Sequence, residues 1–231
     1  MISVSCTVMH ASFDRKRRYA VSSLISALGE EAIRQNWLDF QVMGDMHGRG
    51  PWWNARRCWE HGQTTGATHH LILQDDVKVM NGFVVGIFDL IEAFPDDVMS
   101  LFCLQRKDFQ DQTARWGIAE GVWGCAVLMP VKLVSEFLAW EKANIKPEFK
   151  HDDCRVSLWC VKTKRRVKVP FPNVVDHLPI QSVMRHSHFR PRVSPYFVDD
   201  ETVSNINWNE TENTVTSINS YTQYDKFLIG R

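Results

Sequence analysis

The chain has 231 residues, enough for one substantial α/β core with a short tail, and a two-domain enzyme is not expected. Lys plus Arg equals Asp plus Glu at 27 each, so the formal net charge is zero and no global field directs the protein to nucleic acid or membrane. The six cysteines form no C-x-x-C pair and are interpreted as reduced core residues of a cytoplasmic protein. The amino terminus is unlike a signal peptide and no apolar run reaches membrane-spanning length, so no membrane partner is expected.

Strand and helix patterns alternate from the first residue, which favours an α/β sandwich around a central sheet. The patterns predict strands over 2–9 and 38–43, a strand ending at Asp75, and strands over 98–104, 125–129 and 166–170. Between and after these strands they predict helices over 17–28, 52–62, 82–94, 130–140 and 152–161. Residues 105–120 are polar without periodicity and predict a loop. The domain is expected over 1–185, and 186–231 is interpreted as a tail that wraps the core or is partly disordered.

The most informative segment is an apolar run that ends in two adjacent carboxylates, Asp75 and Asp76. Ligands bind at the carboxyl ends of strands in open α/β sheets. Paired carboxylate oxygens suit Mg²⁺ or Mn²⁺, and such a cation suits a diphosphate, so the run indicates a metal-dependent nucleotide site. An acidic turn that merely ends a strand is the alternative.

Two other acidic pairs occupy different positions. Residues 96–97 precede a strand and are assigned to a turn. Asp152 and Asp153 begin a helix, where they can cap it or present a carboxylate to an acceptor. His177 follows an apolar segment and is a candidate ligand for a cation on Asp75 or Asp76, although a lone histidine is more often structural.

The loop from His10 to Arg15 follows the first strand and precedes a helix, the position at which doubly wound folds meet nucleotides. The chain contains no G-x-G-x-x-G, no phosphate-binding G-x-x-x-x-G-K-[ST] and no G-x-S-x-G, which argues against a nicotinamide oxidoreductase, a P-loop kinase and an α/β-hydrolase. Basic clusters are interpreted as solvated surface, or as phosphate contacts if two or more share a face with the acidic site, and they lie at 15–18, 56–57, 162–166 and 185–192.

Taken in order, these segments resemble the GT-A glycosyltransferases over roughly residues 1–185, and small phage-type members in particular. The resemblance is carried by residues 10–15, 52–57, 66–76, 121–130, 152–153 and 175–177. It implies a GT-A-like three-layer sandwich with a mostly parallel central sheet. The family motif reads D-x-D or E-D-D, so Gln74 departs from it and leaves the usual ribose contact without its carboxylate.

Each role comes from the matching position in the family pattern. The resemblance implies metal ligands at Asp76, Asp75 and His177, with Mn²⁺ or Mg²⁺ as the ion. It implies an acceptor-binding or base carboxylate at Asp153, the preferred base, or Asp152. It places the nucleotide-sugar donor, a UDP-sugar by expectation, against His10, Ser12, Arg15, Gln74, Asp75, Trp123 and Gly124.

The resemblance predicts a glycosyltransferase, hexosyl or pentosyl, that moves a sugar to an acceptor hydroxyl with either inversion or retention. The leading acceptor is a 5-hydroxymethylpyrimidine in phage DNA, which an enzyme must extrude from the duplex to reach. That contact is expected from residues 105–120 or from the basic stretch 185–192. The alternatives are a transferase acting on a polysaccharide or protein, and a non-catalytic nucleotide- or nucleic-acid-binding module, for which Gln74 is the best argument. The oligomeric state is not readable.

Overall fold

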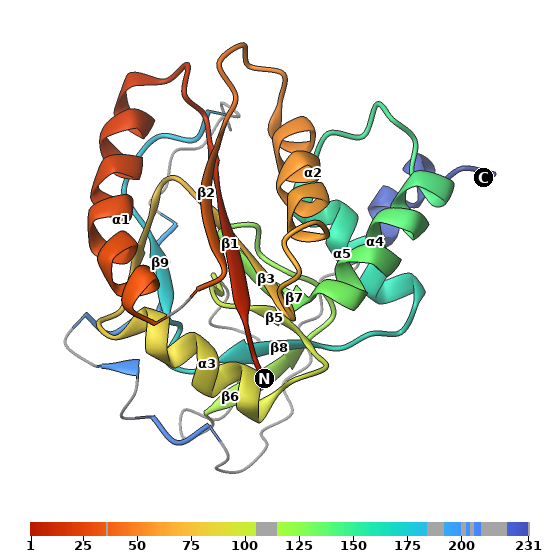
Figure 1. Cartoon of the computed structure of the whole chain (residues 1–231). Helices are drawn as coiled ribbons and strands as arrows, with labels where there is room; N and C mark the ends of the chain where they lie inside the picture. Colours follow the sequence, from red (N-terminus) through yellow and green to blue (C-terminus); the bar gives the residue numbers. More distant parts are fainter. Residues whose placement is uncertain are drawn as a thin grey trace.

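A computed structural model of the chain describes residues 1–35, 37–104, 115–183, 192–199, 202–203, 206–208 and 221–230. Its centre is a sheet of seven strands in the order β2-β1-β3-β7-β5-β8-β6 (Figure 1). The strands are β1 (Val4–His10), β2 (Asp39–Gly44), β3 (His69–Gln74), β5 (Val98–Ser100), β6 (Trp116–Ala119), β7 (Ala126–Pro130) and β8 (Val167–Pro170). Only β7 and β6 run against the others, so the sheet is mostly parallel, as predicted.

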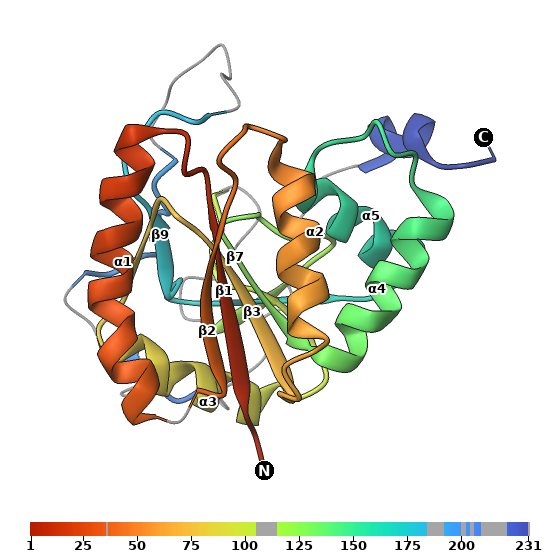
Figure 2. The ribbon, with the colours of Figure 1, turned by 45° about the horizontal axis from the view of Figure 1, so that its top comes forward.

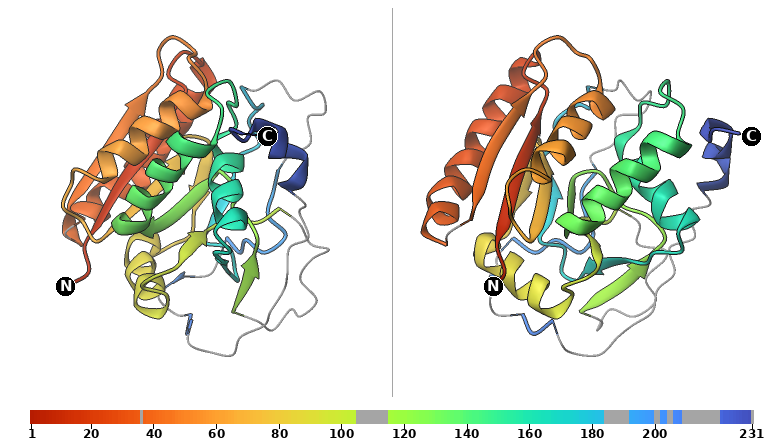
Figure 3. Two further views of the ribbon diagram at one scale, coloured as in Figure 1. Left: turned by 90° about the vertical axis from the view of Figure 1, so that its right-hand side faces the viewer. Right: turned by 45° about the vertical axis from the view of Figure 1, so that its right-hand side comes forward.

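Helices cover both faces of this sheet, which confirms the three-layer α/β class (Figures 1 and 3). The helices are α1 (Arg15–Arg34), α2 (Pro51–Gly62), α3 (Phe83–Ala93), α4 (Val131–Asn144) and α5 (Asp152–Lys162). Alternate residues of β3 enter different cores: Leu71 and Leu73 pack with α1 and α3, while Ile72 packs with α2, α4 and α5. This follows from the period-two alternation of side chains along a strand.

Two short strands were not predicted. β4 (Val77–Val79) and β9 (Val175–His177) form a separate antiparallel ribbon, with Val77 opposite His177. β4 has three residues, too few to show a periodic pattern. The ribbon brings His177 back to the turn that follows β3.

The prediction of a loop over 105–120 was wrong for its last part. Residues 116–119 form β6, which pairs antiparallel with β8. Trp116 and Ile118 of β6 enter the core beside α1 and α3. Burial of these side chains and pairing with β8 therefore make this segment a strand, although its sequence has no periodic pattern. Residues 105–114 lie outside the described residues.

Parts of the carboxyl-terminal region contact the body of the protein. Val203 and Trp208 are buried in the core beside α3, and a 3₁₀ helix, η2 (Tyr221–Phe227), lies near α5, as Figure 2 shows. The division at residue 185 stays a prediction. Among the described residues, every helix is too short or too polar to cross a bilayer.

Candidate active site at the carboxyl edge of the sheet

The first acidic pair lies where the sequence places it, at the carboxyl end of β3. Asp75 and Asp76 are 2% and 1% exposed, so their charges need compensation inside the protein. Asp75 accepts from the Ala11 backbone N–H at 2.8 Å and contacts His10 Nδ1 at 2.8 Å. The Arg17 Nη1 donates to the other carboxylate oxygen of Asp75 at 2.7 Å. Three groups from the β1–α1 segment therefore hold Asp75 in place.

Asp76 faces different partners. Its Oδ1 is 2.6 Å from Arg17 Nη1, and its Oδ2 is 3.2 Å from His177 Nδ1. Burial by itself would raise the pKa of Asp76, but the hydrogen bond and charge of His177, with the charge of Arg17, hold that pKa below its ordinary value. Asp76 is therefore a carboxylate at neutral pH.

Arg17 is a site residue that the sequence interpretation missed. The basic cluster at 15–18 was interpreted as solvated surface, and this was wrong for Arg17, which is 5% exposed and bridges Asp75 and Asp76. A signal was present, because Arg17 falls on the apolar stripe of α1, three and four residues ahead of Ala20 and Val21. A cation on an apolar stripe indicates a buried partner of opposite charge.

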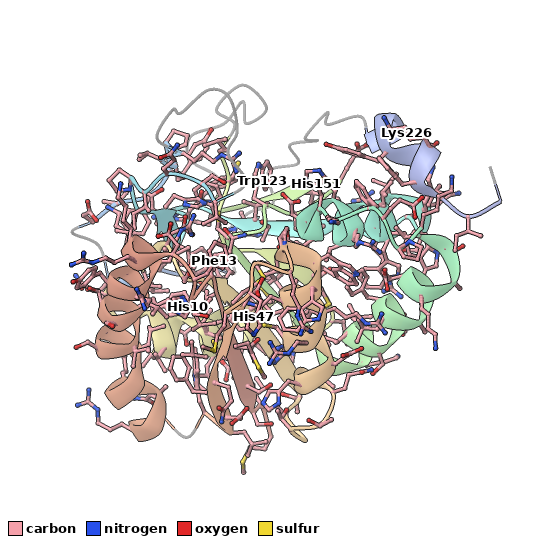
Figure 4. All side chains as sticks on the ribbon, turned by 90° about the horizontal axis from the view of Figure 1, so that it is seen from above. His10, Phe13, His47, Trp123, His151 and Lys226 are labelled. Atoms are coloured by element: carbon pink, nitrogen blue, oxygen red, sulfur yellow. The ribbon has the colours of Figure 1, made fainter. Side chains whose placement is uncertain are left out.

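The second acidic pair lies across a cavity from the first. The cavity has a volume of about 420 Å³, and Asp76, His177, Asp152 and Asp153 all line it. Phe13 and His151, which also line the cavity, are labelled in Figure 4, where the molecule is seen from above. Strand ends and a helix start therefore converge on one space, as expected for ligand sites in α/β sheets.

One carboxyl group of the second pair has a raised pKa. Burial and the neighbouring Asp153 carboxylate raise the pKa of Asp152 to about 7. Asp153 Oδ1 accepts the Cys154 backbone N–H at 2.7 Å. Asp152 therefore exchanges a proton near neutral pH.

Gly124 keeps the wall beside this pair open. A Cβ at position 124 would lie 3.1 Å from Asp153 Cβ, 3.3 Å from Gln74 Nε2 and 3.6 Å from Asp152 Oδ2. Gly124 therefore lies against both Gln74 and the second acidic pair. A side chain at position 124 would press on these three residues, which line the cavity.

The remaining predicted donor-binding residues are more dispersed. His10 supports Asp75. Ser12 has a buried hydroxyl for which no hydrogen-bond partner exists among the described residues, beside Gly44. Arg15 is exposed and lies 6.0 Å over the Tyr19 ring, away from the acidic pairs. Trp123 packs against both halves of the core. The structure thus brings Gln74 and Asp75 to the cavity and places Gly124 beside Gln74, but Arg15 and Trp123 are not among the residues that line the cavity.

Further lining residues come from segments that carry no motif. Asn54 donates from Nδ2 to the carbonyls of Met43 and His10 at 2.8 and 3.3 Å, which joins α2 to the first two strand ends. Arg192 and Tyr224 line the cavity from the carboxyl-terminal region. Tertiary folding alone brings these residues to the site, so local sequence patterns do not reveal them. Of the predicted DNA-contacting stretch 185–192, Arg192 is the one described residue.

The donor set was tested for a divalent cation. Within the described residues no group of three or more His, Cys, Asp and Glu side chains is arranged around a metal-sized point. Asp76 and His177 do face each other, and apart from its ion pair with Arg17, Asp76 Oδ1 accepts no hydrogen bond from any described group. Mg²⁺ and Mn²⁺ commonly take one or two carboxylates and complete their shell with phosphate and water. Asp76 and His177 fit that pattern, while Asp75 would first have to release its contacts.

Comparisons with known proteins give structural likeness at low identity. No protein-family model matches the chain, and no curated protein matches its sequence. The fold is similar to A197 from STIV, with 9% identity, 78% of this chain and 87% of the other covered, and a TM-score of 0.47. It is also similar to mannose-1-phosphate geranyltransferase from Thermus thermophilus, with 11% identity and a TM-score of 0.43, over 73% of this chain and 74% of the other. A glycosyltransferase involved in glycosylation of the major capsid of PBCV-1 matches with 14% identity and a TM-score of 0.36, over 60% of this chain and 66% of the other.

Proposed function

We propose that this protein is a metal-dependent glycosyltransferase that moves a sugar from a nucleotide-sugar, a UDP-sugar in the first instance, to an acceptor hydroxyl. One observation carries the proposal: a buried carboxylate pair at a strand end and a second pair at a helix start share one cavity of about 420 Å³. The first pair suits a cation with a diphosphate, and the second suits proton transfer.

Residues at the two acidic pairs have separate proposed roles. Asp76 and His177 would hold Mn²⁺ or Mg²⁺, which as a Lewis acid stabilises the charge that develops on a departing diphosphate. Arg17 pairs with Asp75 and Asp76 and orients both. Gln74 and Gly124 would contact the substrates near the second acidic pair, since Gly124 lies beside Gln74, Asp152 and Asp153.

Asp152 is the proposed base rather than Asp153. Its raised pKa, about 7, lets it take a proton from an acceptor hydroxyl near neutral pH while that hydroxyl oxygen bonds to the anomeric carbon. Asp153, which is tied to the Cys154 backbone, provides the neighbouring charge that raises this pKa. In a retaining reaction the same carboxylates would orient the acceptor instead.

The proposed acceptor is a 5-hydroxymethylpyrimidine in DNA, as the resemblance to phage-type transferases suggests.

The test is incubation with Mn²⁺ and a panel of nucleotide-sugars, with and without hydroxymethylated DNA, followed by mass spectrometry of the nucleosides. A hexose or pentose gain on the modified base, lost in Asp76→Asn and in Asp152→Asn, is the expected result. Donor hydrolysis without a DNA product would support a glycosyltransferase whose acceptor is a polysaccharide or protein instead of DNA. If no nucleotide-sugar is turned over, the result would support a non-catalytic binding module.

A further inference from the structure

A second, cationic groove adjoins the candidate active site. It has a volume of about 330 Å³ and lies between the amino-terminal end of α2 and the segment that joins α4 to α5. Its lining includes the cations Arg49, Arg56, Lys142 and Lys150, all of which are exposed. The formal charge of the whole chain is zero, so this groove is a local concentration of positive charge.

Nearby carboxylates neutralise little of this charge. In the described ranges, Arg49, Lys142 and Lys150 make no ion pair. Arg56 pairs with Glu60 at 2.8 Å, but both side chains are about half exposed, so the pair is weak. The one acidic lining residue, Glu141, is already paired with the fully buried Arg155. The groove therefore presents uncompensated cations to an anionic ligand.

Trp53 orders two of the nearby guanidinium groups. Arg49 Cζ and Arg57 Cζ lie 4.7 and 4.5 Å from the centre of the Trp53 ring. Arg57 also donates to the Gly44 carbonyl at 3.1 Å. For Arg49, which lines the groove, stacking limits the motion of the guanidinium and leaves its edge available, the arrangement that binds phosphate oxygens in pairs.

The start of α2 adds backbone donors to the same groove. Gly50 precedes the helix at φ 109°, a conformation suited to glycine, and no side chain caps the first turn. Pro51, the first residue of α2, has no N–H, so the backbone donors without helical acceptors in this turn are those of Trp52 and Trp53, at the positive end of the helix dipole. They supplement the four cations and point to the same class of ligand.

The groove adjoins the candidate active site, because Gly50 lines both spaces. Asp45 fixes the loop at this junction, since its two carboxylate oxygens accept from the His47 and Gly50 backbone N–H groups at 3.1 Å each. An acceptor held in the groove can therefore extend across Gly50 toward Asp152. A strand with regularly spaced phosphates matches several cations along one path better than a single small anion does.

We propose that this groove binds the phosphodiester backbone of a nucleic-acid acceptor and positions it for reaction in the adjoining cavity. The choice of acceptor deepens the proposed function and rests on it, whereas the binding itself can be measured without turnover. Phosphate contacts of this kind set position and affinity but carry no sequence information.

The experiment measures binding of a fluorescently labelled DNA duplex to the full chain by anisotropy between 50 and 200 mM KCl. Four phosphate contacts predict a loss of affinity of about 100-fold over this range, with a log–log slope near −4. Lys142→Glu with Lys150→Glu should weaken binding at least about tenfold and flatten the slope by about 2. The control, Arg34→Glu with Lys132→Glu, changes exposed cations outside the groove by the same charge and should leave affinity and slope near wild type.

Several outcomes would overturn the proposal. They are salt-independent or absent DNA binding, equal losses in the groove and control variants, and tenfold tighter binding of an acidic polysaccharide than of DNA. Donor hydrolysis, measured in parallel without DNA, separates the two proposals. Donor turnover without DNA binding would contradict the proposed DNA-binding groove but support the proposed transferase activity. DNA binding that depends on the groove cations, without donor turnover, would support the groove and contradict the transferase activity.

Discussion

At the scale of single residues, Arg17 connects the two buried carboxylates of the β3 turn. It contacts Asp75 and Asp76 at 2.7 and 2.6 Å from one nitrogen, Nη1. Burial alone would lower the pKa of Arg17, but the two carboxylates raise it, so the guanidinium stays charged. The site therefore contains a permanent protein cation beside the position proposed for a metal ion.

Removal of this cation is expected to destabilise the fold. Arg17→Met keeps most of the side-chain stem but leaves two buried carboxylates without their shared partner, which costs about 3–5 kcal/mol of unfolding free energy. Arg18→Met is the control, because Arg18 is exposed on the same helix and its loss should change stability by about 0.5 kcal/mol or less. Urea denaturation of both variants measures the difference. Equal stabilities would contradict a buried bridging role for Arg17.

Asp152 gives the protein a stability that depends on pH. Its pKa rises on folding from 3.8 to about 7, so between these values the folded protein holds a proton that the unfolded chain has released. The free energy of unfolding should therefore fall as pH rises through this window. In Asp152→Asn that decrease should be absent, and in Asp153→Asn it should be smaller because one source of the shift is gone. Unfolding curves from about pH 4 to about pH 8 test this, and identical pH profiles in wild type and Asp152→Asn would contradict it.

The sequence identified the residues that carry a recognisable local pattern. Asp75 and Asp76 follow an apolar run, and Asp152 and Asp153 begin a helix, so their neighbours reveal their positions. Arg192 and Tyr224 line the same cavity but come from segments without periodicity. The chain path that brings them there depends on tertiary packing. The proposed roles of all the site residues stay predictions.

At the scale of secondary-structure elements, α3 packs closely against the segment at residues 202–203. Val203 is fully buried, and its backbone N–H donates to the Asn81 carbonyl at 3.0 Å. A Cβ on Gly86 of α3 would lie 1.9 Å from Val203 Cγ1. A glycine is thus required for this close approach.

Gly86→Ala should destabilise the protein by about 1–3 kcal/mol, since the added methyl group overpacks the core. Combined with Val203→Ala, it should show a coupling energy of about 0.5–3 kcal/mol, because the two residues are in contact. Gly29→Ala in α1 is the control: its new Cβ would meet its nearest neighbour at 3.9 Å, and higher helix propensity should stabilise it by up to about 1 kcal/mol. Thermal unfolding of the four variants measures these effects. Additive costs would contradict contact between α3 and Val203.

Long periodic elements were predictable, whereas the short strands β4, β6 and β9 were not. The apolar stripe of α1 and the buried run of β3 extend over enough residues to reveal their period. β4 and β9 have three residues each, and β6 has four, so partners distant in sequence determine their structure. The ribbon of β4 and β9 matters for the proposed metal site, because it places His177 against Asp76.

At the scale of the whole molecule, one end of the sheet gathers the candidate chemistry. The carboxyl ends of β1 and β3 meet the start of α5 around one cavity, and the cationic groove adjoins this cavity at Gly50. The sheet and the helices on its two faces hold these groups in fixed relation, so donor and acceptor would approach from different sides of the same opening.

The most direct test of the proposed site is the position of Mn²⁺ in crystals grown with a nucleoside diphosphate, located by its anomalous scattering. We expect a peak between Asp76 and His177, with the diphosphate in the cavity beside Gln74, and no such peak in crystals of Asp76→Asn. A metal bound elsewhere, or a nucleotide bound outside this cavity, would contradict the proposed site.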